Sequence, residues 1–431
     1  MTLTTPRRVA IACQGGGSHT AFTAGVLSRL CTSEQFADHR VVGLSGTSGG
    51  GVCALLAWSA LCDGDRSKAA ALLEGFWEDN SAREPVDRLL NAGMVSAAVL
   101  QNLGLLAAVS PYVLPGTGLT QFRELLSRHV DFDRIDVDTD RVHPMLLLGA
   151  VDVVSGRFRA FNSHHDRITA DTVIASAAIP NLFRAVHVNG ASYWDGLFSQ
   201  NPPVRDLLEV EPDELWVIQI NPQTIDREPQ TLTEISDRRN ELAGNLSLYQ
   251  ELGFIETIDR LLADGTINPG KGYKQVTVRV IEMPRTALSR YLGPASKVNR
   301  DPAFLRELMT SGAAQADRFL ATLAFERAWA DRDIDAMLRW AHEDALLVSA
   351  PPFPAGDAGR VPLRDYLESV VDKEVRIDPT RKQIARDRVT WRIRMRKDDG
   401  TVNEGVAEAT ITGNRISGIR LGRDDLPSTV G

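Results

Sequence analysis

Two glycine-rich stretches decide the fold of this 431-residue chain: Cys13-Gln14-Gly15-Gly16-Gly17-Ser18-His19 and Gly46-Thr47-Ser48-Gly49-Gly50. Each follows a short strand-like run, at Val9–Cys13 and Arg40–Leu44, and each precedes a helical pattern. A strand followed by a glycine loop and a helix, and then repeated, is typical of a parallel sheet flanked by helices. We therefore expect an α/β fold with a mostly parallel central sheet.

The second stretch fits the pattern G-x-S-x-G, which places a serine on a sharp turn between a strand and a helix. Small residues on both sides of Ser48 permit such a strained turn, and the N-terminus of the following helix favours a developing negative charge. Ser48 is therefore the candidate nucleophile, and its neighbours Thr47 and Gly49 are candidates for substrate contact. The alternative is a Gly/Ser-rich loop without chemistry.

The first stretch offers successive glycines, whose backbone N–H groups can point at an anion without interference from Cβ atoms. A nucleotide-phosphate loop is the competing interpretation. However, G-x-G-x-x-G would need glycine at position 20, where Thr20 stands, and no G-K-[ST] follows for a P-loop. We expect Gly15, Gly16 and Gly17 to bind an oxyanion, and His19 to shape the loop or face the substrate.

Asp195 is the candidate general base. It directly follows a predicted hairpin, Val186–Trp194, whose Asn189-Gly190 suits a type I′ turn. A triad in the order serine, acid, histidine is not expected, because His342 is the only histidine after Asp195 and lies in the predicted second domain. A buried aspartate can act alone when desolvation raises its basicity. The residues thus predict a Ser48–Asp195 dyad in an acyl hydrolase.

Neither a metal nor an organic cofactor is expected. The sequence has no H-E-x-x-H motif, and His164-His165-Asp166 lacks ligand spacing on any predicted element.

With these motifs the chain resembles the patatin-like phospholipase family over roughly residues 8–300. The family combines a G-G-G-x-[RK]-G oxyanion loop, a G-x-S-x-G elbow and a D-G-[GA] aspartate. The resemblance implies a three-layer fold and an acyl-enzyme mechanism, with Gly15, Gly16 and Gly17 as oxyanion donors, Ser48 as nucleophile and Asp195 as base. Two further segments match the family: Ala175–Pro180 ahead of the aspartate, and Asn201-Pro202 after it.

Two departures from the family pattern concern substrate preference more than chemistry. His19-Thr20 takes the place of the usual Arg/Lys-Gly, and Leu197 replaces the second small residue after the aspartate. The expected substrate is a lipid or another acyl ester. Two alternatives stay open: an acyltransferase or thioesterase that uses the same dyad, and a lipid-binding protein with a decayed site.

The pattern of predicted helices and strands changes after about residue 322, so we expect two domains, 1–322 and 323–431. The second begins with helical patterns and ends with three strand-like runs, Arg388–Met395, Thr401–Ile411 and Arg415–Leu421. This α+β arrangement resembles the SnoaL-like or nuclear-transport-factor-2-like cone. That fold serves several tasks, and we expect dimerisation, giving a homo-oligomer, or substrate presentation here.

The chain as a whole carries a formal net charge of −8, which argues against nucleic acid as a partner. Its four cysteines match no metal spacing, and no signal-peptide pattern precedes Cys13, so we expect reduced thiols and a cytoplasmic location. The most apolar stretch, Ala92–Leu114, is interrupted by polar residues and a proline and is too short to span a bilayer. The alternatives for this stretch are a lid, an acyl-chain wall with peripheral membrane contact, and a core helix.

Overall fold

The computed structural model describes residues 6–102, 105–107, 109–113, 116–180, 182–225, 227–270, 273–284, 292–349, 360–371, 376–396 and 402–422. The chain forms two compact units. Unit 1 comprises Met1–Val276 and Met283–Ala313, and unit 2 comprises Thr277–Glu282 and Ala314–Gly431. The division falls inside the long helix α8 (Pro302–Ala330), which also runs through position 322 without a break.

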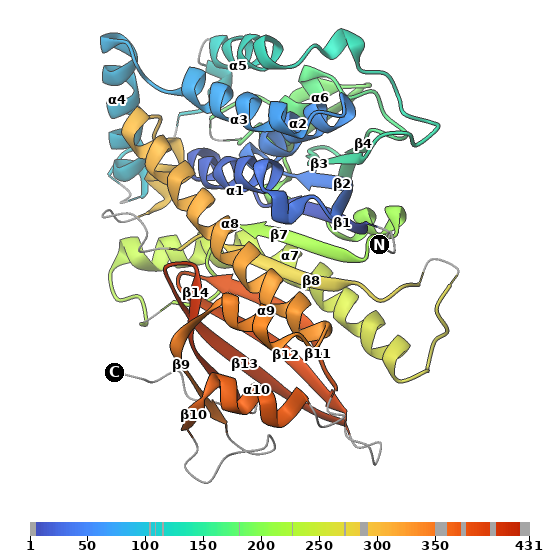
Figure 1. The fold of residues 1–431 in the computed structure, drawn as a ribbon. Helices are drawn as coiled ribbons and strands as arrows, with labels where there is room; N and C mark the ends of the chain where they lie inside the picture. The colour runs from blue at the N-terminus through green and yellow to red at the C-terminus, as the bar shows by residue number, and fades with distance from the viewer. Residues whose placement is uncertain are drawn as a thin grey trace. The chain divides into compact units, whose positions relative to one another are not determined.

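Unit 1 contains a mixed sheet with the strand order β7-β1-β2-β3-β6-β5 (Figure 1). Its centre is parallel, as expected: β1 pairs with β2 and β7, and β2 pairs with β3. Beyond β3 the pairing turns antiparallel, since β6 and β4 both run against β3 and β5 runs against β6. The strands are β1 (Arg7–Cys13), β2 (His39–Gly46), β3 (Met145–Asp152), β4 (Phe158–Asn162), β5 (Val186–Val188), β6 (Ala191–Asp195) and β7 (Glu214–Gln219).

Helix α2 forms the inner helical layer over this sheet. It contacts β1, β2 and β3, and α3 in turn packs on α1 and α2 (Figure 1). The apolar residues of α2 surround its axis, so the helix is buried on nearly every side, as its sequence predicts. The helices of unit 1 are α1 (Ala21–Thr32), α2 (Gly49–Cys62), α3 (Arg66–Asn80), α4 (Pro85–Asn102), α5 (Thr117–His129), α6 (Ala170–Ala177), α7 (Leu232–Ala263) and the first part of α8.

Helices α1 and α8 cross in unit 1 at glycines. A Cβ atom on Gly25 of α1 would come within 2.0 Å of the Met309 carbonyl oxygen, and one on Gly312 of α8 within 2.1 Å of the Phe22 carbonyl oxygen. The two backbones therefore touch where no side chain fits.

The apolar stretch that the sequence leaves open begins within helix α4. It is not a core helix: along Pro85–Gln101 the structure buries only Asn91. Among the described residues no helix is both long and apolar enough to cross a membrane.

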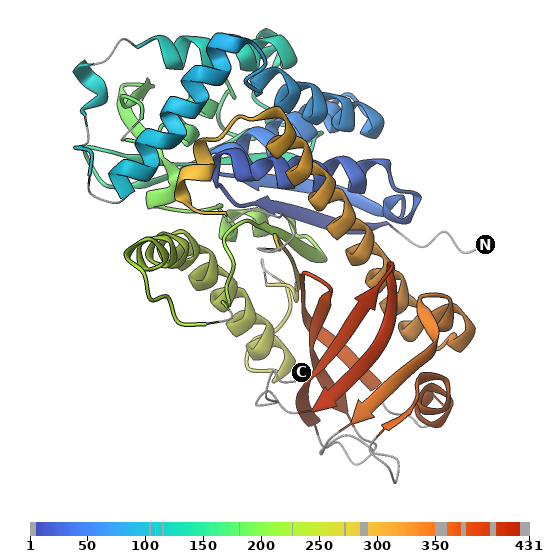
Figure 2. The same ribbon diagram turned by 90° about the vertical axis from the view of Figure 1, so that its left-hand side faces the viewer.

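Unit 2 is built on a strongly twisted sheet with the order β10-β9-β14-β13-β12-β11-β8, drawn from yellow to red in Figures 1 and 2. Strands β11 to β14 form an antiparallel meander of four strands, one more than the sequence predicts. The elements are β8 (Thr277–Glu282), the second part of α8, α9 (Ile334–Arg339), β9 (Ala341–Ser349), β10 (Arg360–Pro362), α10 (Leu363–Val371), β11 (Arg376–Ala385), β12 (Arg388–Arg396), β13 (Val402–Thr412) and β14 (Arg415–Gly422).

The region around Phe325 and Leu338, at the start of the expected second domain, contains two helices. Phe325 lies in α8, which ends at Ala330, and Leu338 lies in α9. Arg332 between them has a positive φ of 56°, a conformation that interrupts a helix.

Candidate active site

Three segments of unit 1 meet at the carboxyl ends of the parallel strands. Cys13 at the end of β1 pairs with Gly46 at the end of β2, so the glycine loop and the serine turn follow at the same edge of the sheet. Gly46 also pairs with Leu148 of β3, and Ala150 two residues further along β3 pairs with Asp195 of β6. The sheet thus brings Gly15–Gly17, Ser48 and Asp195 together from distant parts of the sequence.

Ser48 stands on a strained turn at the start of α2. Its φ of 57° and ψ of −134° place a residue other than glycine in a region that costs of order 1–3 kcal/mol. Neighbouring glycines make the turn possible, because a Cβ on Gly46 would lie 2.5 Å from the Gly50 carbonyl oxygen. Ser176 of α6 holds the turn: its carbonyl and hydroxyl oxygens accept from the Ser48 N–H at 2.9 and 3.2 Å.

Asp195 is completely buried at the end of β6. Burial raises the pKa of its carboxyl to about 6, although the Leu197 N–H and the Ser48 hydroxyl both act in the opposite direction. Oδ1 accepts from the Leu197 N–H at 2.8 Å, while Oδ2 has no hydrogen-bond partner among the described residues. The Ser48 hydroxyl is therefore close enough to influence the carboxylate, but the two groups lack ideal hydrogen-bond geometry.

The glycine loop lies directly against the serine turn. A Cβ on Gly15 would lie 2.6 Å from the Thr47 carbonyl oxygen and 3.1 Å from Ser48 Cβ, so only glycine permits this approach. The Gly15 N–H donates to Asn201 Oδ1 at 2.8 Å and is engaged there. Among the described residues, by contrast, no hydrogen bond is made by the N–H groups of Gly16 and Gly17.

His19 is buried beside the loop in unit 1. Its Nε2 lies 2.7 Å from Ser296 Oγ, and its ring packs edge-on against Phe304. Burial, and secondarily the charge of Lys297, lower the pKa of His19 to about 3, so the imidazole is neutral. These contacts hold the His19 side chain in place beside the loop.

The other two predicted neighbours of the nucleophile are packed against protein. Thr47 is fully buried, and its hydroxyl donates to the Gln200 carbonyl oxygen at 2.7 Å. A Cβ on Gly49 would lie 2.2 Å from Thr20 Oγ1, so the start of α2 and the end of the glycine loop are in close contact.

Two amide side chains hold the loop, and the sequence gives no sign of either role. Gln14 accepts from the backbone N–H groups of Ile220 and Asn221, both at 2.8 Å. Asn201 accepts from Gly15 and donates through Nδ2 to the Gly244 carbonyl oxygen of α7 at 3.2 Å. The Asn201-Pro202 motif marks the position, but a partner 186 residues away leaves no local pattern.

Metal ligands are not assembled at this site. Across the parts of the chain that the structure describes, no group of three or more His, Cys, Asp or Glu side chains could hold a metal ion. His164 lies with its Nε2 3.7 Å from Asp138, and burial lowers the pKa of its imidazole.

Residues 11–208 match the family model described as patatin-like phospholipase. No curated protein matches the chain.

Solved structures match about a quarter of the chain. An NTF2-like protein of unknown function from Mesorhizobium loti is 20% identical, with a TM-score of 0.22, and the match covers 24% of this chain and 88% of that one. An NTF2-like protein of unknown function from Cytophaga hutchinsonii is 10% identical, with a TM-score of 0.21, over 25% of this chain and 89% of that one. Likenesses of this strength say nothing about what this chain binds.

Proposed function

Taking residues 11–208 as a patatin-like phospholipase domain, we propose that this chain hydrolyses carboxylic esters of lipids through a Ser48–Asp195 dyad. The observation that carries the proposal is Asp195. Its fully buried carboxyl has a pKa raised to about 6, one oxygen without a hydrogen-bond partner in the described structure, and the Ser48 hydroxyl beside it. A carboxylate in this state is a better proton acceptor than an exposed one.

In the first half of the reaction, Asp195 accepts the hydroxyl proton as Ser48 Oγ attacks the ester carbonyl. The C=O bond becomes a C–O⁻ bond, and the N–H groups of Gly16 and Gly17 are the donors with no competing partner among the described residues. The N-terminus of α2 adds a favourable dipole. When the C–O bond to the alcohol breaks, the proton passes from Asp195 to the leaving oxygen, and an acyl-enzyme remains.

In the second half, water takes the place of the alcohol. Asp195 accepts a proton from the water as its oxygen attacks the acyl-enzyme carbonyl, and the same N–H groups hold the second oxyanion. Collapse breaks the bond to Ser48 Oγ, which recovers its proton, and the fatty acid leaves. In this scheme Gly15 shapes the loop and does not donate to the oxyanion, because its N–H already donates to Asn201 Oδ1.

We also infer two domains, 1–322 and 323–431, the second SnoaL-like or nuclear-transport-factor-2-like. The chain divides into two compact units, and this supports a two-domain organisation. The boundary between the units lies inside α8. Dimerisation or substrate presentation by the second domain and a cytoplasmic location stay predictions. Light scattering of the full chain measures its mass in solution and so tests dimerisation. The mass of a monomer at all concentrations would exclude it.

Hydrolysis of nitrophenyl esters of increasing chain length tests the proposed reaction. The wild type should release nitrophenol and react covalently with a fluorophosphonate probe, whereas Ser48→Ala should do neither. The preferred chain length separates a lipase from an enzyme of small esters. Activity that survives in a folded Ser48→Ala protein would exclude the dyad, and labelling without hydrolysis would favour acyl transfer.

A further inference from the structure

Helix α4 turns its apolar side to the solvent. Val86, Leu89, Leu90, Met94 and Leu100 are exposed by 68, 75, 57, 45 and 41%. Counted from Val86, the other four follow after 3, 4, 8 and 14 residues, so all five lie on one broad face of the helix. A face of this kind normally packs on the core, and its exposure along a whole helix marks an interaction surface.

A polar contact helps to anchor α4 to the rest of unit 1. Asn91 is the one buried residue along Pro85–Gln101. Its Nδ2 donates to Asn299 Oδ1 at 2.9 Å, and its Oδ1 accepts from the Arg300 N–H at 2.8 Å. The anchor fixes the helix so that the apolar face points away from the core.

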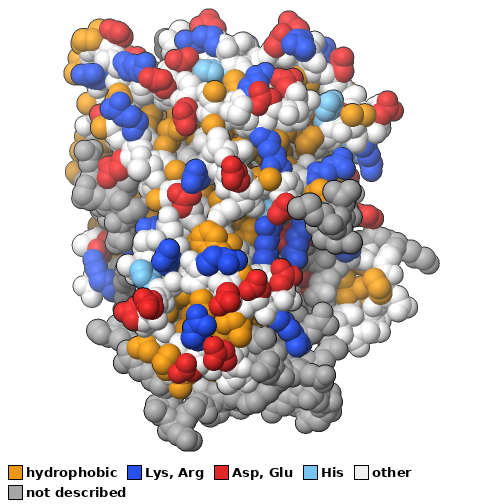
Figure 3. All heavy atoms as spheres, in the orientation of Figure 1, with side chains coloured by type: hydrophobic (Ala, Val, Ile, Leu, Met, Phe, Trp, Pro, Cys, Tyr) orange, Lys and Arg blue, Asp and Glu red, His pale blue; other side chains and the backbone are white. Residues whose placement is uncertain are grey.

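The apolar character continues beyond α4. The N–H groups of Leu105 and Leu106 bond to the Leu100 carbonyl oxygen at 2.9 and 3.3 Å, which keeps these two exposed side chains next to the end of the helix. The sequence contains no charged residue from position 89 to position 122. In Figure 3 hydrophobic side chains reach the surface in the upper left corner, where Figure 1 places α4. We name as the α4 surface Val86, Leu89, Leu90, Met94, Val99, Leu100, Leu105 and Leu106.

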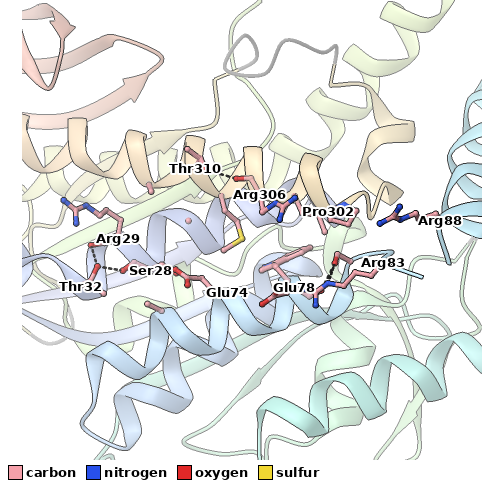
Figure 4. Close-up of a pocket in the computed structure, with 17 residues that line it drawn as sticks. Ser28, Arg29, Thr32, Glu74, Glu78, Arg83, Arg88, Pro302, Arg306 and Thr310 are labelled. Carbon is pink, nitrogen blue, oxygen red and sulfur yellow. Dashed lines mark hydrogen bonds and ion pairs between the residues drawn. The ribbon is translucent and has the colours of Figure 1, made fainter. Parts of the chain in front are cut away.

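Charged residues of both signs border the start of α4, where Glu84 and Asp87 lie between Arg83 and Arg88. Arg83 and Arg88 lie at one end of a groove of about 770 Å³ in unit 1, and Arg29 and Arg306 line it further along (Figure 4). The groove also contains the carboxylates Glu74 and Glu78, so its lining carries four positive and two negative charges. The excess of arginine in the groove lining, beside an apolar helix face, complements the anionic headgroups and acyl chains of a phospholipid surface.

Hydrogen bonds connect the segment after α4 to the residues ahead of β5, the hairpin partner of the strand that carries Asp195. Arg184 donates to the carbonyl oxygens of Pro111 and Tyr112 at 3.3 and 3.0 Å, and the Ala185 N–H donates to the Tyr112 hydroxyl at 3.2 Å. Ala185 directly precedes β5, which pairs with β6. A surface bound at α4 is therefore linked through a few residues to the candidate active site.

We propose that the α4 surface docks on an anionic phospholipid surface, with the apolar face at the level of the acyl chains and the arginines at the level of the phosphates. The proposal rests on the proposed function, because a lipid hydrolase has to meet an aggregated substrate. A second copy of the chain is the alternative occupant, and the oligomeric state of the parent protein and of the triple variant described below distinguishes the two.

Vesicle flotation tests this binding separately from catalysis. The protein is Ser48→Ala, alone and with Leu89→Gln, Leu90→Gln and Met94→Gln together. The vesicles are phosphatidylcholine, or phosphatidylcholine and phosphatidylglycerol in equal parts. We expect the triple replacement to lower binding by about a hundredfold. Val142→Gln with Val154→Gln removes two exposed apolar side chains elsewhere and should leave binding unchanged, while Arg88→Gln should weaken binding to the anionic vesicles alone.

Short-chain ester hydrolysis in the wild-type background separates this proposal from the proposed function. The triple variant should keep this activity, which also shows that it is folded. Absence of vesicle binding by the parent protein would overturn the docking proposal, whatever the ester assay shows. A parent that is dimeric, with a monomeric triple variant, would also overturn it and assign the α4 surface to a second copy.

Discussion

At the scale of single residues, the proposed chemistry depends on the protonation of Asp195. The carboxyl is fully buried, and burial raises its pKa to about 6. Only the ionised form can accept the Ser48 proton, so kcat/KM for a soluble ester should rise with pH and reach half of its plateau near pH 6. A pH–rate profile measures this midpoint. A midpoint near 4, the ordinary range of an exposed aspartate, would contradict the role of burial.

The same pKa makes a prediction about stability. Because the folded pKa is raised, the protonated form is favoured in the folded state. The resulting stability is full below the ordinary pKa of 3.8 and is lost as pH rises through about 6. Asp195→Asn removes this penalty of ionisation, so relative to wild type it should gain about 3 kcal/mol between pH 4 and pH 8.

Chemical denaturation of both proteins at the two pH values measures this gain. Asp152→Asn is the matched control: hydrogen bonding from Ser155 lowers the pKa of this exposed carboxyl, so its effect is confined to pH values below 3.8, and the variant should show little change between pH 4 and pH 8. A gain for Asp195→Asn that is independent of pH would show that the carboxyl titrates as it does in the unfolded chain.

At the scale of the loop, Asn201 is a positioning residue. Its Oδ1 holds the Gly15 N–H, which fixes the loop against Ser48. Asn201→Ala should lower kcat by roughly 10- to 100-fold with little change in KM, because displaced donors stabilise the transition state less. Asn201→Asp keeps an acceptor for Gly15 and should recover part of the rate. Equal losses in both variants, with KM raised, would indicate a general structural role.

At the scale of helices, the crossing of α1 and α8 tests the packing of unit 1. Gly25→Ala forces a Cβ into the Met309 carbonyl oxygen and should destabilise the protein by about 3 kcal/mol. Gly253→Ala in α7 meets no atom within 4 Å and should stabilise by about 0.5–1 kcal/mol through helix propensity. Denaturation midpoints of the two variants measure the contrast, and equal effects would mean that α1 and α8 can separate easily.

Some helices, strands and turns can be predicted from the sequence more readily than others. Buried strands such as β1, expected at Val9–Cys13 and observed at Arg7–Cys13, and the Asn189-Gly190 turn are visible because apolar runs and glycine turns are local signals. Both turn residues have the expected positive φ. Strand β11 (Arg376–Ala385) is missed because its central Lys382 is charged yet fully buried. Likewise, the glycines and Ser48 of the candidate site are readable from motifs, whereas the hydrogen bond from Gly15 to Asn201 depends on the folded chain.

At the scale of the molecule, unit 2 has a buried charged centre of its own. Glu326 of α8 lies 2.9 Å from Lys382 Nζ, pairs with Arg279 and accepts from Trp391 Nε1 at 2.8 Å. Burial alone would raise the pKa of Glu326, but the two cations hold it below its ordinary value. The carboxylate therefore stays charged between two buried cations, all within unit 2.

Glu326→Gln should consequently weaken unit 2 and spare the chemistry of unit 1. Removal of one member of a buried ionic cluster costs about 3–5 kcal/mol, because the remaining charges lose their partner. Amide hydrogen exchange should show lost protection in β11–β13 with little change in β1–β3, and hydrolysis of a soluble ester should persist. Glu368→Gln is the control, since its exposed pair with Arg364, at 3.6 Å, contributes less than about 1 kcal/mol. Equal loss of protection in β1–β3 would mean that the two units unfold as one, and that the buried cluster stabilises the candidate active site as well.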